Sequence, residues 1–209
     1  MPIHREDAER LMQELDEELH MQLEHHSKFM ADLWDEDDWS FVIKSHALIE
    51  ASVTQMLTEH SGDKRFKNLF ERLPLSDEEI GKISVAKLLN FLGKRERRFI
   101  RLYSQLRNRL VHRVENINFS LKTHIANMDS SRRKSWQESV TWFSVDGDTK
   151  SFWENAAIQM PRVALWIAIF LLVSMCSIST NEIKGFSEIK KLALKTAEEL
   201  FSNVSLGKD

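Results

Sequence analysis

The sequence predicts an all-α protein. Its 209 residues include only 6 glycines and 3 prolines, which favours long helices over tight turns. Apolar residues make up 42% of the chain, enough for a hydrophobic core. In several segments they recur with a period of about 3.6 residues, which is typical of amphipathic helices and not of strands. A chain of this length suits one domain with extensions.

The first predicted helix covers residues 5–33 and belongs to an N-terminal helical arm, residues 1–35. Leucines recur on it at every fourth position, at Leu11, Leu15, Leu19 and Leu23. A row with this spacing lies on one helix face and serves packing. We therefore expect the arm to pack on the domain or on a partner, with residues 36–209 forming the main helical domain.

An acidic run at residues 35–38 marks the next helix start, because Asp is favoured at N-caps and in first turns. It predicts a helix over residues 39–60 that ends at Gly62. A short helix over residues 66–73 follows, and Pro74 ends it.

Ser76 and Glu79 have the spacing of a capping box, in which two side chains satisfy the first backbone N–H groups of a helix. They predict a helix over residues 77–92. Gly93 is a natural end for that helix, since glycine adopts the left-handed conformation that often follows a last turn.

The helix predicted over residues 98–115 carries the most informative residues of the chain. Its apolar positions are Phe99, Leu102, Tyr103, Leu106, Leu110 and Val114. Asn108 and His112 are four residues apart and share a face, whereas Arg107 lies about 140° from His112 around the helix. Arg109, three residues before His112, can also reach the imidazole. A guanidinium, an amide and an imidazole within two turns can bind a phosphate and move protons around it.

The segment at residues 163–181 carries no charge, and residues 163–178 are nearly all apolar. A membrane span needs about 20 predominantly apolar residues, so two alternatives stay open. We favour a core or dimer-interface helix over a membrane anchor. Residues 182–201 then predict a C-terminal amphipathic helix that packs back on the domain.

Charge and cysteine content restrict how the protein can bind nucleic acid and in which cellular compartment we expect it. The formal net charge is -3, so the chain has no global basic field and RNA binding would rely on a local patch. The single cysteine, Cys176, excludes an intramolecular disulfide and is expected to be a small buried hydrophobe. The charged first 18 residues do not look like a signal peptide, and we expect a cytoplasmic protein.

Arg107, followed by the polar Asn108 and, after four intervening residues, by His112, resembles the mark of the HEPN superfamily. Residues 41–51 resemble the first core helix of HEPN proteins related to the mannitol operon repressor, and residues 116–119 suit the same group. The resemblance covers roughly residues 39–128. It implies a HEPN-like helical bundle.

Active members of the superfamily are metal-independent endoribonucleases, often of toxin or defence type, that need no cofactor. The resemblance implies that a ribose 2′-hydroxyl attacks the adjacent phosphodiester, with His112 as general base or acid. Arg107 would stabilise the developing charge, and Asn108 would orient the phosphate or the imidazole. Arg109 and Arg113 would contact the RNA backbone. A second protomer usually completes the site, so a homodimer is expected.

Glu50 and His46 lie four residues apart and share one face of the predicted first core helix. HEPN-like proteins often carry a polar residue here that faces the Arg-His helix, which implies a hydrogen bond from Arg107 or His112 to Glu50. A purely structural salt bridge of Glu50 is an equal alternative. Val114 stands where toxins with a nucleotidyltransferase antitoxin often have Tyr, which argues against that particular pairing.

A non-enzymatic alternative stays open, because relatives of the mannitol operon repressor include regulators of transcription. In that case Arg107 and His112 would bond across a dimer interface. An antitoxin of the toxin-type nuclease, or a regulatory protein, is a further possible partner. The His/Glu cluster near the N-terminus lacks a zinc-binding spacing and paired cysteines, so we expect no metal site.

Overall fold

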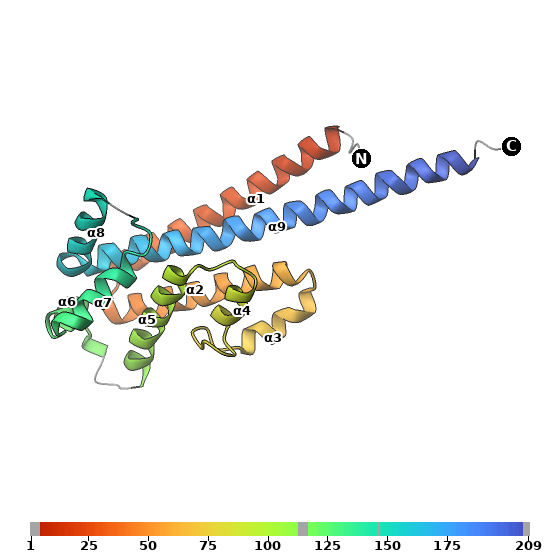
Figure 1. Ribbon diagram of the computed structural model, residues 1–209. Coiled ribbons are helices and arrows are strands. Elements are labelled where there is room, and N and C mark those ends of the chain that lie inside the picture. Colours follow the sequence, from red (N-terminus) through yellow and green to blue (C-terminus); the bar gives the residue numbers. More distant parts are fainter. Residues whose placement is uncertain (1–4, 113–116, 146, 207–209) are drawn as a thin grey trace.

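The computed structural model describes residues 5–112, 117–145 and 147–206, and within these ranges it contains helices and no strand (Figure 1). The all-α prediction is confirmed. The helices are α1 (Arg5–Asp32), η1 (Leu33–Asp35), α2 (Asp38–Ser61), η2 (Lys64–Phe66), α3 (Lys67–Arg72), α4 (Lys82–Leu88), α5 (Lys94–Val111), α6 (Leu121–Ala126), α7 (Ser130–Val140), α8 (Asp148–Gln159) and α9 (Pro161–Leu206).

The long helix α9 packs along both α1 and α2 and forms the axis of the fold (Figure 1). Trp166 Nε1 donates to Met30 O at 2.7 Å, and Asn181 Nδ2 donates to Leu15 O at 3.1 Å. Because the α9 numbers rise as the α1 numbers fall, the two helices are antiparallel. The N-terminal arm therefore packs on the rest of the same chain.

The apolar run of α9 forms part of the core along one face only. The buried residues are Ala164, Leu165, Ala168, Ile169, Leu172, Val173 and Cys176. Leu171, Met175 and Ile178 on another face are exposed. By length and composition α9 is also a helix that could cross a membrane, and 50% of its most apolar window is buried in the fold. The structure thus uses this run as a core helix, and Cys176 is buried as predicted.

The amphipathic helix predicted over residues 182–201 is not a separate element. It continues α9 without a break, so it does not turn back on the domain but runs on beside α1. Gly185 permits the close approach, since a Cβ atom there would lie 3.1 Å from Leu15 Cδ1. Lys184 and Glu18 form an ion pair across the same interface.

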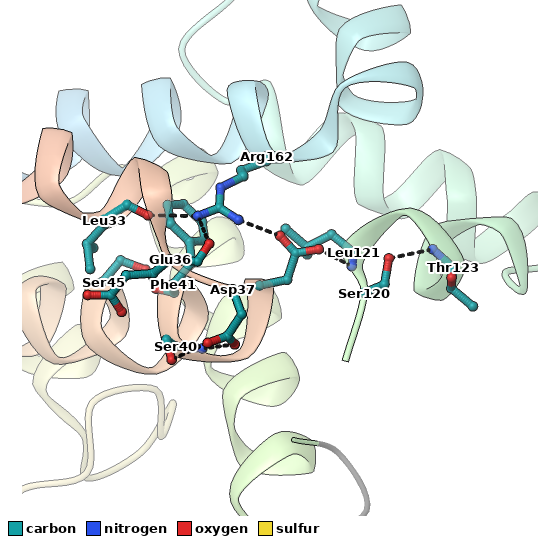
Figure 2. A network of polar contacts seen from close by, with 11 residues as sticks. Leu33, Glu36, Asp37, Ser40, Phe41, Ser45, Ser120, Leu121, Thr123 and Arg162 are labelled. Carbon is teal, nitrogen blue, oxygen red and sulfur yellow. Dashed lines mark hydrogen bonds and ion pairs between the residues drawn. The ribbon is translucent and has the colours of Figure 1, made fainter. Parts of the chain in front are cut away.

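Arg162, in the first turn of α9, ties this helix to the corner between α1 and α2, and Asp38 links the same corner to α6 (Figure 2). Its Nη1 donates to Asp38 Oδ1 at 2.9 Å, and its Nη2 donates to Leu33 O at 2.7 Å and to Glu36 O. Asp38 Oδ2 accepts from the backbone N–H of Leu121 at 2.8 Å. One guanidinium and one carboxylate thus tie together three helix termini.

The prediction of a helix over residues 77–92 is wrong at both ends, because α4 begins only at Lys82 and ends at Leu88. Gly93 does not end this helix but is the N-cap residue of α5. Asp77 Oδ1 accepts from the backbone N–H groups of Glu79 and Ile80, at 2.8 and 2.9 Å, and holds a turn in place of the predicted capping box. Such local bonds compete with helix formation. A Cβ atom at Gly81 would lie 2.4 Å from Asp77 O, so the turn requires glycine there.

The motif helix α5 begins at Lys94, four residues before the predicted start, and its described part ends at Val111. Positions 113–116 lie outside the described residues. Tyr103 Oη is 2.6 Å from Ser45 Oγ of α2, so α5 packs against α2. On its other side α5 contacts α7 (Figure 1).

Candidate functional site

A cleft with two lobes lies between the C-terminal half of α5 and the α6–α7 segment; we call it the α5–α6 cleft. Its histidine lobe, about 540 Å³, is lined by Leu106, Asn108, Arg109, Leu110, His112, Phe119 and His124. Its amide lobe, about 750 Å³, is lined by Leu102, Gln105, Leu106, Asn108, Arg109, His124, Asn127, Met128, Arg132, Ser135 and Trp136. The two lobes are adjacent, because Leu106, Asn108, Arg109 and His124 line both of them.

The structure brings three of the predicted site residues together in the histidine lobe. Asn108 and Arg109 lie on the last turns of α5, and His112 is the C-cap residue with an exposed side chain. The positions of these side chains follow from helix geometry, as predicted from their spacing.

Arg107 lies on another side of α5 and is not among the residues that line the histidine lobe. Its Nη1 donates to Asn108 Oδ1 at 3.1 Å, so the acceptor of this amide is engaged and the Nδ2 hydrogens remain for a ligand. Arg107 Nε is buried and has no hydrogen-bond partner among the described residues. Arg107 therefore touches the lobe through Asn108.

His46 of α2 is a structural residue close to Arg107. Its Nε2 lies 3.0 Å from Ser104 Oγ, within the packing between α2 and α5. Burial, and secondly the positive charge of Arg107, lower the pKa of His46 to about 4. His46 is therefore neutral at pH 7 and helps to fix the two helices.

Glu50 forms an ion pair with Lys82, whose Nζ donates to Glu50 Oε1 at 2.7 Å. We expected either a hydrogen bond from Arg107 or His112 to Glu50 or a structural salt bridge of Glu50. The structure has a salt bridge, and its partner is Lys82. The side chain of Lys82 is only 2% exposed, so it needs such a partner. Arg113, the remaining predicted site residue, lies outside the described residues.

His124 of α6 lies in the cleft and was not among the predicted site residues. It lines both lobes, and its ring centroid is 5.5 Å from that of Phe119 and 6.4 Å from that of Trp136. Burial, and secondly the charge of Arg109, lower the pKa of His124 to about 4. No spacing rule connects it with His112, since only the tertiary structure brings α6 and the end of α5 to one lobe.

A groove next to the cleft joins two basic segments that are far apart in the sequence. Lys94, Arg95 and Arg98 of α5 line it together with Lys134 of α7 and Lys150 of α8. Glu138 pairs with Arg98 at 2.8 Å and offsets part of the charge. In the sequence these are two separate basic runs, whereas the contact between α5 and α7 makes them one local basic strip.

Over the part of the chain that the structure describes, no three His, Cys, Asp or Glu side chains gather as a metal site would require. Comparisons with protein-family models, curated proteins and solved structures found no match to this chain.

Proposed function

We propose that this protein is a metal-independent RNA endonuclease and that the histidine lobe of the α5–α6 cleft holds the scissile phosphate. The observation that carries the proposal is the presence of His112, Asn108 and Arg109 in one lobe. An imidazole can transfer protons near neutral pH, and an amide with a guanidinium can bind phosphate oxygens. The basic strip beside the cleft supports binding of a polyanion by a chain of net charge -3.

In the proposed reaction the 2′-oxygen of a ribose attacks the adjacent phosphorus. The P–O2′ bond forms, the P–O5′ bond breaks, and the products end in a 2′,3′-cyclic phosphate and a 5′-hydroxyl. His112 accepts the 2′-hydroxyl proton as general base. All atoms of both products come from the RNA itself and only a proton moves from O2′ to O5′, so the step needs no oxidant or reductant.

Arg107 and Asn108 act as a unit in this proposal. Arg107 engages Asn108 Oδ1, and the Nδ2 hydrogens of Asn108 then donate to a phosphate oxygen. Arg109, which lines the lobe itself, contributes positive charge where the phosphorane develops. Arg107 is thus a positioning residue, and Asn108, Arg109 and His112 are the groups that touch the substrate.

The departing 5′-oxygen needs a proton, and one imidazole cannot be base and acid in the same step. His124 is not suited to the acid role, because its pKa is lowered to about 4 and its neutral imidazole is a very weak acid at pH 7. We propose that His112 of the partner subunit in a homodimer supplies the proton, with two motif helices facing each other across a two-fold axis.

Cleavage of end-labelled single-stranded RNA tests the proposal. We expect the wild-type protein to produce fragments with 2′,3′-cyclic phosphate ends in the presence of EDTA. His112→Ala should reduce the rate at least about 100-fold, the lower range for loss of a general acid-base group. His25→Ala, which removes an exposed histidine of α1, is the matched control and should cleave like wild type.

The proposal fails if His112→Ala cleaves at the wild-type rate, or if pure wild-type protein leaves all RNAs intact while remaining folded. EDTA sensitivity of the cleavage would overturn the metal-independent mechanism.

A non-enzymatic interaction module is the second candidate, favoured by the exposed apolar residues Leu171, Met175 and Ile178 on α9. An apolar helix face of this kind suits a protein partner. Under this candidate the wild-type protein cleaves no RNA, and charged substitutions on this α9 face, not at His112, remove its partner or its second copy in size-exclusion chromatography.

A further inference from the structure

We propose that the amide lobe of the α5–α6 cleft binds one nucleobase of single-stranded RNA, with adenine preferred. The identification of the ligand as RNA rests on the proposed function, whereas the base-binding character rests on the lobe alone. Its volume of about 750 Å³ lies within the range of roughly 300–1,000 Å³ typical of small-ligand sites.

The floor of the amide lobe is apolar. Leu106 and Trp136 are buried core residues, and Leu102 and Met128 pack against them. Trp136 Nε1 donates to Ala157 O at 2.9 Å, so its polar edge is already satisfied by the protein. A floor of this composition suits the π-face of a base, and contact between bases and aromatic or apolar side chains is how proteins hold unpaired nucleotides.

The rim of the amide lobe carries carboxamides. Gln105 of α5 and Asn127, directly after α6, are exposed and line the lobe from opposite elements. Each carboxamide offers a donor and an acceptor side by side. Adenine presents the complementary pair at N6 and N7, which is why Asn and Gln are its usual partners. Two cations also line this lobe: Arg109, which it shares with the histidine lobe, and Arg132, which pairs with Asp129 at 3.3 Å.

The position of the lobe relative to His112 fits one nucleotide. Asn108, Arg109 and His124 line both lobes, so a phosphate in the histidine lobe and a base in the amide lobe are neighbours. His124 lies at the junction, where its neutral imidazole suits the uncharged ribose between the two groups. The substrate class that follows is single-stranded RNA with an adenine next to the scissile phosphate, because paired bases are not available for such a lobe.

Equilibrium binding to the His112→Ala protein tests the inference without cleavage. Short fluorescein-labelled oligoadenylate, oligouridylate, oligocytidylate and oligoguanylate are titrated at one fixed salt concentration and followed by fluorescence anisotropy. We expect oligoadenylate to bind about tenfold more tightly than the others, as one bidentate contact allows. Adding Gln105→Ala or Asn127→Ala should bring the four affinities to within about twofold of one another.

Two matched controls remove the same side chains elsewhere. Gln55→Ala on α2 and Asn155→Ala on α8 each truncate an exposed carboxamide outside the cleft, and both should retain the preference for adenine. Thermal melting of every variant shows that it is folded, which is expected because Gln105 is an exposed helix position and Asn127 follows the last turn of α6.

Equal affinities of the four oligonucleotides, or a preference that survives both cleft substitutions, would overturn the inference. The result is separable from the nuclease proposal. Suppose that cleavage requires His112, whereas Gln105→Ala and Asn127→Ala change the cleavage rate at none of the four bases. The nuclease proposal would then hold and the base site would be refuted. Adenine-specific binding that depends on these two residues, in a protein that cleaves nothing, would support the base site and refute the nuclease.

Discussion

Removal of the Arg162 guanidinium is expected to destabilise the whole fold, because it ties α9 to the corner between α1 and α2. In Arg162→Ala the Asp38 carboxylate and the carbonyls of Leu33 and Glu36 lose their shared donor (Figure 2). Breaking a fully buried ion pair costs about 3–5 kcal/mol. The side chains of Arg162 and Asp38 are 22% and 20% exposed, so water can solvate the remaining carboxylate and reduce this cost. We expect the free energy of unfolding to fall by about 3 kcal/mol.

Urea denaturation followed by circular dichroism at pH 7 measures this change. Arg162→Lys keeps the charge but lacks the planar fork that serves three acceptors, so we expect a loss of about 1 kcal/mol. Arg5→Ala, which removes an exposed arginine of α1, is the control and should leave the midpoint unchanged. A loss below about 1 kcal/mol in Arg162→Ala would refute the role assigned to this network.

The other predictions concern pH, packing and thiol reactivity. The pKa of His46 is about 4 in the folded chain and 6.5 as its ordinary value, so the unfolded state binds more protons between these pH values. The contribution of His46 to stability is thus present above pH 6.5 and lost as pH falls toward 4. His46→Asn should therefore flatten the dependence of the urea midpoint on pH in this window. An unchanged slope would contradict this role of His46. Gly81→Ala places a methyl group 2.4 Å from Asp77 O and should lower the free energy of unfolding by about 1–3 kcal/mol in the same assay; a neutral result would mean that the turn before α4 moves freely. Burial raises the pKa of the Cys176 thiol to about 12, so iodoacetamide should label it in urea and not in the native protein, as intact-mass measurement would show.

Local patterns in the sequence were sufficient to predict most helices. The ends of α1 and α2 lie within one residue of the predicted bounds, because the fourfold leucine spacing and the Asp37 N-cap act over a few residues. The start of α4 was predicted wrongly for an equally local reason. Two turn-forming bonds to Asp77 compete with a capping box at Ser76, and the sequence pattern alone does not rank them.

The candidate site was predictable on one side only. Helix periodicity placed Asn108 and His112 on one face and Arg107 on another, and the lining of the histidine lobe agrees with this. The opposite wall, which includes His124 and Asn127, comes from segments that approach α5 only in the folded chain. The partner of Glu50 was equally hidden, because Lys82 becomes buried through the turn that precedes α4.

The sequence by itself determined the helical class, the amphipathic faces and the order of the chemical groups along α5, since each depends on spacing within a few turns. Only the tertiary structure decided which face of the uncharged run at 163–181 is buried. An apolar helix has the same composition whether protein or lipid covers it, and here α1 and α2 cover one of its faces. The cleft was decided in the same way, because its walls are helices that no local pattern brings together.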